Sequence, residues 1–334
     1  MKAFADLNII RALTFTRLKN ILKVQTSLLY SRVFNRYLLL GKPYILTVEP
    51  TNQCNLKCAQ CATGTGKLTR PLVNMAFSTF RKIIDELNNE LCYIVLFNQG
   101  EPFINKKLCD FIEYAKQHRI YVISSTNGHF LDRVDICRRL VSSGLDQLII
   151  SLDGADQNTY QKYRTGGNFD RVIAGIQNLV RMKKELGRHR PYIILQFLVM
   201  RHNEHQIPAI KKLGQQLKVD KIVFKTVQVE SVTDAIEFLP LNQKQSRYKR
   251  DGDQLTLQNS HRRFCSRLWT SSTILSDGSV VPCCFDKNGQ FTFGNVNGEQ
   301  NFTQIWSSER YEKFRRYFTN RRNHSDQRQS ILIC

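Results

Sequence analysis

The stretch from residue 44 to residue 61 reads YILTVEPTNQCNLKCAQC. Its first part is a short apolar run of the kind that forms a buried strand, and we expect a strand over Tyr44–Glu49. Its second part places Cys54, Cys58 and Cys61 on the loop that follows. Parallel α/β folds carry their sites where strands end. Three thiols directly after a strand therefore indicate a functional loop.

Downstream of this stretch, apolar runs alternate with amphipathic helical patterns. The alternation predicts a parallel sheet with helices packed outside it. Six such units predict an α/β fold, a partial (β/α)6 TIM-like barrel rather than a closed barrel of eight units. The other expected strands are Tyr93–Asn98, Tyr121–Ser125, Gln147–Leu152, Tyr192–Val199 and Lys221–Val227, and the expected helices are Phe77–Asn88, Asn105–Gln117, Leu131–Ser142, Arg171–Glu185 and Glu204–Leu217.

The pattern changes on both sides of this region. Four parts are expected: a basic N-terminal helical extension (1–42), the α/β domain (43–235), a linker or mobile loop (236–262) and a small C-terminal α+β domain (263–334). In the last part, the turn Asp277-Gly278 predicts a hairpin between Thr273–Leu275 and Ser279–Val281. A terminal helix is expected over Thr303–Phe318.

The N-terminal extension carries eight Lys and Arg residues against one Asp. Such a helix either packs on the main domain or lies on a membrane surface. One apolar side of this helix is expected to consist of Leu18, Ile21, Leu22, Val24, Leu28 and Leu29.

The composition is that of a globular protein, with 334 residues, 42% hydrophobic and 23% charged. A net charge of +21 indicates either an anionic partner or basic side chains spread over solvated faces. No apolar run approaches the roughly 20 residues of a membrane span, and no signal-peptide core is visible. We therefore expect a cytoplasmic protein whose thiols stay reduced. Its ten cysteines are then metal ligands, catalytic groups or, as expected for Cys92, Cys109 and Cys137, core residues.

Three thiolates on one short loop can bind three corners of a [4Fe-4S] cluster and leave the fourth iron open. The alternative is a zinc site or a set of buried thiols. Structural zinc sites normally close with four ligands, and no His or fourth Cys lies near Cys54, Cys58 and Cys61.

The cysteine loop resembles the C-x3-C-x2-C motif of the radical S-adenosylmethionine (SAM) superfamily. Further elements of that family recur in order where later strands are expected to end, so the resemblance covers residues 43–227. Gln99-Gly100-Glu101-Pro102 resembles G-G-E-P, residues 124–128 resemble S-T-N-G, and Ser151-Leu152-Asp153-Gly154 resembles S-x-D-G. Gln60 departs from the aromatic residue that usually precedes the third cysteine.

The resemblance implies which residues contact SAM. A carboxylate suits the ammonium group of SAM and an arginine suits its carboxylate, while glycines allow close approach of the backbone. The residues implied are Gln99, Gly100, Glu101, Ser125, Asn127, Ser151, Asp153 and Arg164.

The C-terminal part resembles the SPASM extension of radical SAM enzymes over about residues 262–334. That extension binds one or two auxiliary [4Fe-4S] clusters, and the implied ligands are Cys265, Cys283 and Cys334. Cys284 neighbours Cys283, and either of the two could be the ligand. The family usually ends with a further cysteine pair, so Cys334 lacks one expected partner. Structural cysteines without a second cluster are the alternative.

The resemblance implies reductive cleavage of SAM to methionine and a 5′-deoxyadenosyl radical. That radical abstracts hydrogen from a peptide, protein or sugar-like substrate, in an oxidation, cross-linking or maturation step. A flavodoxin- or ferredoxin-like protein is the expected electron donor. Two other classes stay open: a nucleic-acid-modifying or RNA-binding protein, because of the charge, and a zinc-stabilised binding module without catalysis. No RRM or KH motif supports the former.

Overall fold

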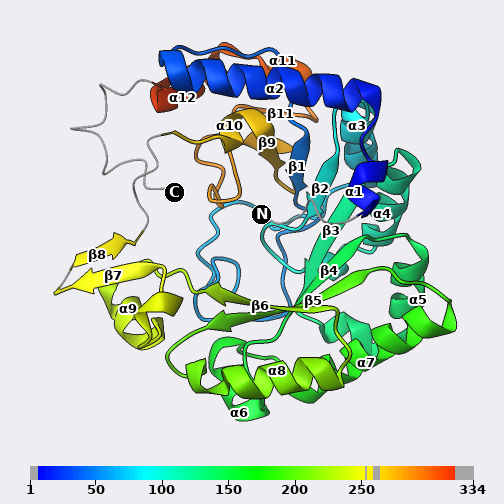
Figure 1. Cartoon of the computed structure of the whole chain (residues 1–334), viewed down its shortest axis with the longest axis vertical. Helices are drawn as coiled ribbons and strands as arrows, with labels where there is room; N and C mark the ends of the chain where they lie inside the picture. The colour runs from blue at the N-terminus through cyan, green and yellow to red at the C-terminus, as the bar shows by residue number, and fades with distance from the viewer. Residues whose placement is uncertain (1–6, 253, 259–263, 320–334) are drawn as a thin grey trace. The chain divides into compact units, whose positions relative to one another are not determined.

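The computed structural model describes residues 7–252, 254–258 and 264–319. The chain forms two compact units, each built from separate stretches of sequence (Figure 1). The first unit contains Met1–Gln53, Leu68–Ile123 and Arg262–Cys334, and the second contains Cys54–Lys67 and Ser124–His261. Within the described residues, no helix is both long enough and apolar enough to cross a membrane.

The strands of the first unit are centred on β1 (Ile45–Val48). β2 (Tyr93–Leu96) pairs with one edge of β1 in parallel, with Ile45 opposite Tyr93. β9 (Ser271–Ile274) pairs with the other edge, also in parallel. β9, β10 (Ser279–Val281) and β11 (Gly294–Asn295) then form an antiparallel series. The hairpin predicted at Asp277-Gly278 is confirmed, whereas the pairing of β9 with β1 was not predicted.

The helices of the first unit include the predicted α3, which packs against α4 through stacked rings of Phe80 and Phe111 at 4.4 Å. The single terminal helix predicted over Thr303–Phe318 is wrong, because a turn at Ser307 and Ser308 divides it into two helices. The helices are α1 (Leu7–Arg11), α2 (Phe15–Phe34), α3 (Phe77–Leu87), η2 (Pro102–Ile104), α4 (Leu108–Gln117), α10 (Arg267–Thr270), α11 (Phe302–Trp306) and α12 (Glu309–Thr319).

The N-terminal helix α2 does not have the apolar side that the sequence predicts. Its buried residues are Arg17, Asn20, Val24, Ser27 and Ser31. Of the six apolar side chains expected on one side, Val24 is buried, whereas Leu18, Leu22 and Leu29 are exposed to solvent. The prediction failed because α2 is held by hydrogen bonds to backbone carbonyls and amides rather than by an apolar face.

The second unit contains parallel strands β4 (Gln147–Ser151), β5 (Tyr192–Val199) and β6 (Lys221–Thr226). β3 (Tyr121–Thr126) begins in the first unit and ends in the second. All six strands predicted for residues 43–235 are therefore present, with ends that differ by at most two residues. The helices are η3 (His129–Asp132), α5 (Val134–Ser142), α6 (Gln157–Tyr163), α7 (Phe169–Glu185), η4 (Glu204–Gln206), α8 (Ile207–Gln216), α9 (Val232–Phe238) and η5 (Gln243–Gln245).

The sequence predicts a linker or mobile loop over residues 236–262, but this segment contains a β-hairpin. β7 (Tyr248–Asp251) and β8 (Gln254–Leu257) pair antiparallel. Tyr248 and Leu255 pack against the apolar cluster of the second unit. Because the hairpin packs through only these two side chains, its composition resembles that of a linker.

Candidate functional site

The cysteine loop is held in a fixed shape within the second unit. The Lys57 amide donates to the Thr165 carbonyl at 3.0 Å, and the Ala59 amide donates to the Tyr163 carbonyl at 3.1 Å. The backbone at Gly64 passes so close to the loop that a Cβ on this residue would lie 2.5 Å from the backbone nitrogen of Cys58. The backbone after α6 therefore sets the path of the cysteine loop.

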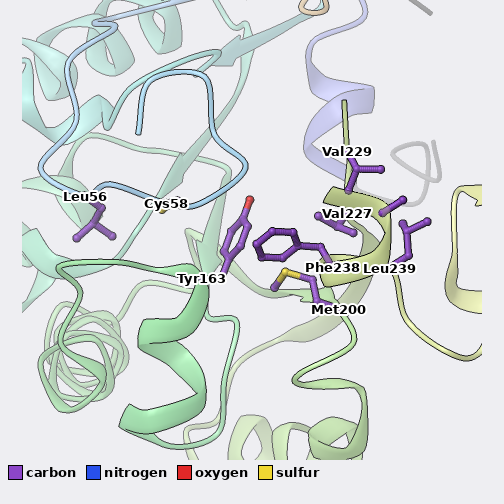
Figure 2. Close-up of a cluster of buried hydrophobic side chains, with 9 residues drawn as sticks. Leu56, Cys58, Tyr163, Met200, Val227, Val229, Phe238 and Leu239 are labelled. Carbon is purple, nitrogen blue, oxygen red and sulfur yellow. The ribbon is translucent and has the colours of Figure 1, made fainter. Parts of the chain in front are cut away.

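The three cysteines border an apolar cluster. Cys58 is buried in it, while Cys54 and Cys61 are half-buried and pack against it. Figure 2 shows Tyr163 beside Phe238 in this cluster, and their ring centroids are 6.4 Å apart. These apolar side chains cover the Cys58 thiol, whereas Asn55 and Lys57 of the same loop are exposed. The cluster consists of Leu56, Cys58, Tyr163, Met200, Val227, Val229, Ala235, Phe238 and Leu239.

A buried ion pair lies next to Cys58. Arg164 Nε donates to Asp153 Oδ2 at 2.6 Å, and Arg164 Nη1 lies 3.8 Å from Cys58 Sγ. Burial opposes the charge of the guanidinium, but Asp153 and Cys58 outweigh it and raise the pKa of Arg164 well above its ordinary value. Burial raises the pKa of the Cys58 thiol, and Arg164 opposes that rise. The structure thus brings three predicted site residues, Asp153, Arg164 and Cys58, into contact.

Asn127 connects the end of β3 to the cysteine loop. Its Nδ2 donates to Asn55 Oδ1 at 2.8 Å. Its Oδ1 lies 3.1 Å from Nδ1 of the buried His129, while His129 Nε2 accepts the Asn168 amide at 2.9 Å. Because Nε2 is an acceptor, Nδ1 carries the proton and fixes the orientation of the Asn127 amide. Of the other predicted residues, Ser125 lies at the end of β3 and Ser151 at the end of β4, half-buried and buried.

The Gln99-Gly100-Glu101 turn belongs to the first unit, as does the residue before the cysteine loop. The Glu101 amide donates to the Gln53 carbonyl at 2.7 Å, and Glu101 Oε1 accepts the Phe103 amide. Gly100 has φ +76°, and a Cβ there would lie 2.6 Å from the Gln53 oxygen and 2.7 Å from the Thr51 oxygen. Only glycine fits this position.

Glu49, at the end of β1, is a site-organising residue that sequence reasoning missed. Its buried carboxylate pairs with Arg70 at 2.7 Å. It also accepts hydrogen bonds from the side chain of Asn98, the amide of Gln99, and the amide and hydroxyl of Ser276. The only signal in the sequence is a carboxylate that directly follows an apolar strand.

The C-terminal cysteines belong to the first unit. Cys283 is buried, and Cys265 and Cys284 are half-buried. Burial raises the pKa of Tyr311 to about 12, although Arg315 and a hydrogen bond with Ser272 oppose that rise. Cys284 instead lies 3.8 Å from Arg267 Nη1. Cys334 lies outside the described residues.

The cysteine loop fits a multi-iron cluster. No two of the nine described cysteines form a disulfide with each other. Among the described residues, no three His, Cys, Asp or Glu side chains converge on one metal ion. A cluster needs no such convergence, since each of its thiolates binds a different iron. The thiol donors, their apolar surroundings and the nearby guanidinium therefore suit an anionic iron–sulfur cluster.

Two family models match the chain. The model described as the radical SAM superfamily matches residues 48–213, and the SPASM model, described as an iron-sulfur cluster-binding domain, matches residues 265–332. The chain belongs to the radical SAM superfamily. It is a radical SAM enzyme with a SPASM domain, and its cofactors are SAM and [4Fe-4S] clusters.

Several characterised proteins resemble this enzyme in sequence. The tungsten-containing aldehyde ferredoxin oxidoreductase cofactor-modifying protein of Pyrococcus furiosus is 27% identical over 302 residues, which cover 81% of this chain and 82% of that protein. Mycofactocin maturase MftC of Mycolicibacterium smegmatis is 32% identical over 140 residues, 42% of this chain and 35% of that protein. The match to Fe-coproporphyrin III synthase of Methanosarcina barkeri, at 30% identity, covers 55% of this chain and 44% of that protein.

Solved structures confirm the predicted fold class. Streptococcus suis SuiB bound to S-adenosylmethionine superposes with a TM-score of 0.63 at 17% identity, covering 89% of this chain and 71% of that one. A second SuiB structure holds the precursor peptide SuiA, with a TM-score of 0.62 at 16% identity. The enzyme anSMEcpe with bound AdoMet gives a TM-score of 0.58 at 16% identity, covering 81% and 82%.

Proposed function

We propose that this enzyme removes a hydrogen atom from a peptide or protein side chain, in an oxidation or cross-linking step of maturation. The observation that carries the proposal is the cysteine loop beside the Asp153–Arg164 pair, in a chain that also has a SPASM domain. The names of mycofactocin maturase and of the SuiB complex with its precursor peptide support a peptide substrate. When bound, the cluster and SAM supply the radical that removes the hydrogen.

Each residue of the site has a proposed task. Cys54, Cys58 and Cys61 bind the cluster. Arg164 holds a positive charge beside Cys58 and is oriented by Asp153. The apolar cluster excludes water, which would otherwise quench reactive species.

The remaining predicted residues are assigned to SAM. Glu101 carries the carboxylate for its ammonium group, and Gly100 lets the backbone of Gln99–Glu101 approach it closely. Asn127, held by His129, presents a fixed amide. Ser125 and Ser151 supply hydroxyls at the ends of β3 and β4.

In the C-terminal domain we assign an auxiliary cluster to Cys265, Cys283 and Cys334. Cys283 is favoured over Cys284 as the ligand, because the Cys283 thiol is buried whereas the Cys284 thiol is half-buried and lies 3.8 Å from Arg267 Nη1. Such a cluster would accept an electron from the substrate and so complete a two-electron oxidation.

We assign the electron donor to an acidic protein such as flavodoxin or ferredoxin, in the cytoplasm. A net charge of +21 attracts such a partner. The rate of reduction by flavodoxin should fall as salt is added; a rate independent of salt would contradict this assignment.

The site assignment is tested by anaerobic reconstitution of the full chain. Cys58→Ser should lose about four irons per chain and all release of 5′-deoxyadenosine. Cys137→Ser is the matched control, because Cys137 is also buried but its thiol donates to the Leu131 carbonyl in the core. Full iron content in Cys58→Ser would refute the assignment.

The auxiliary cluster and the substrate need separate measurements. Cys283→Ser should lower iron content while Cys284→Ser does not; the reverse result would reassign the ligand.

For the substrate, peptides and small metabolites are isolated from deuterated cells that produce the enzyme, and the two fractions are supplied to the reconstituted enzyme separately. Deuterium should enter 5′-deoxyadenosine from the peptide fraction, and transfer from the small-molecule fraction alone would reject a peptide substrate.

A further inference from the structure

An apolar stripe faces solvent along α2. It consists of Phe15, Leu18, Leu22, Leu29 and Val33, which are between 44% and 84% exposed. At 3.6 residues per turn, these five side chains fall within about 60° of one another around the helix axis. Single exposed leucines are normal, but a contiguous stripe marks an interaction surface.

The opposite face of α2 fixes the helix in this orientation. Arg17 donates to four backbone carbonyls, those of Ala12, Asn88, His118 and Arg119. Asn20 exchanges two hydrogen bonds with the backbone of Lys42, at 2.9 and 3.0 Å. Ser27 and Ser31 accept the amides of Leu40 and Leu38. A rotation that buried the stripe would break all of these bonds.

The exposed charged side chains beside the apolar stripe are all basic. Lys19, Lys23, Arg32 and Arg36 are all exposed. No Asp or Glu occurs between Leu7 and Lys42. A surface that is apolar along its centre and positive at its edges complements phosphate head groups above acyl chains.

We propose that the stripe of α2 docks on an anionic phospholipid bilayer. The helix lies in the plane of the interface, with its leucines and Phe15 at the acyl boundary and its lysines at the phosphates. The stripe extends along most of a 20-residue helix, so it presents a long straight edge that a flat bilayer can contact throughout. This surface is distinct from the cysteine site and independent of the proposed function.

The test is co-sedimentation of the full reconstituted chain with vesicles. The enzyme should bind vesicles of equal phosphatidylglycerol and phosphatidylcholine, should not bind pure phosphatidylcholine, and should be released by about 0.5 M salt. Leu22→Asp with Leu29→Asp should weaken binding by about tenfold or more.

The matched control is Leu72→Asp with Leu241→Asp. These two leucines are 61% and 69% exposed, against 67% and 65% for Leu22 and Leu29, so the change in charge and surface is the same elsewhere on the molecule. The control should bind vesicles as the wild type does. Both double variants should keep full iron content and release of 5′-deoxyadenosine.

Four outcomes overturn the proposal. The first is wild-type enzyme that ignores anionic vesicles, and the second is equal loss of binding in both double variants. The third is a wild-type dimer that the Leu22/Leu29 variant lacks, which would make α2 a contact between two copies. The fourth is vesicle binding only after removal of residues 320–334, which would make that segment the occupant of the stripe.

Discussion

Replacement of Glu49 by Gln tests whether a single carboxylate organises the first unit. Its Oε1 accepts from Arg70 and from both the amide and the hydroxyl of Ser276. Its Oε2 accepts from Arg70, the Asn98 side chain and the Gln99 amide. A glutamine keeps the shape but turns one oxygen into an NH2 group that faces three donors, and it leaves Arg70 without a countercharge.

The expected loss follows from burial. The Glu49 side chain is 0% exposed and that of Arg70 is 7% exposed. Removing one partner of a buried ion pair costs about 3–5 kcal/mol, since the remaining charge stays in a medium of low dielectric constant. For a chain of this size, that loss lowers the melting temperature by about 4–7 °C.

The assay is thermal unfolding monitored by circular dichroism, with Glu312→Gln as control. Glu312 pairs with Arg316 at 2.7 Å, the same distance as the buried pair, but the two side chains are 33% and 58% exposed. An exposed pair of this kind contributes about 0.3–0.5 kcal/mol. Equal losses in Glu49→Gln and Glu312→Gln, or a loss below about 1 kcal/mol in Glu49→Gln, would refute the reasoning from burial.

Three further changes test other parts of the site. Gly100→Ala should lower the free energy of unfolding by about 2 kcal/mol or more and should weaken SAM binding measured by calorimetry. Gly66→Ala is the control, because Gly66 has a similar φ but no atom lies within 4 Å of an added Cβ; it should lower the free energy of unfolding by only about 1 kcal/mol. Burial lowers the pKa of His129, so neutral His129 stabilises the fold above the ordinary histidine pKa near 6.5, and this stability is lost as the pH falls. Between about pH 7.5 and 5.5, the free energy of unfolding measured in urea should therefore decrease more in the wild type than in His129→Gln. Asp153→Asn leaves Arg164 without its carboxylate and should cost about 3 kcal/mol in the same assay, whereas a loss below about 1 kcal/mol would show that the pair does not stabilise the site.

The sequence predicts the strands of this enzyme well because each is a short apolar run with clear ends. Tyr192–Val199, for example, is found with the same bounds as expected. The orientation of α2 is a different matter. Its apolar residues satisfy a helical pattern, but the pattern does not say whether they face the protein or solvent. Arg17 and Asn20 decided that question through hydrogen bonds to backbone groups of other segments.

The same limit applies to the candidate site. Cys54, Cys58 and Cys61 are close in sequence, so their spacing alone predicts a common ligand. Asp153 and Arg164 were predicted as separate contacts to SAM, and only the structure shows that they pair with each other. Such pairs join residues from different loops of the fold. A local sequence pattern does not indicate which loops come together.

Glu49 shows what such a long-range contact implies for the enzyme. One carboxylate binds both the Gln99 amide, in the turn proposed to hold SAM, and Ser276, in the hairpin of the SPASM domain. β9, the first strand of that hairpin, pairs directly with β1, which ends at Val48 directly before Glu49. A displacement of the hairpin must therefore either break bonds to a buried charge or move the turn at Gln99. Because the first alternative is costly, the hairpin and the turn are expected to keep a fixed relation within the first unit.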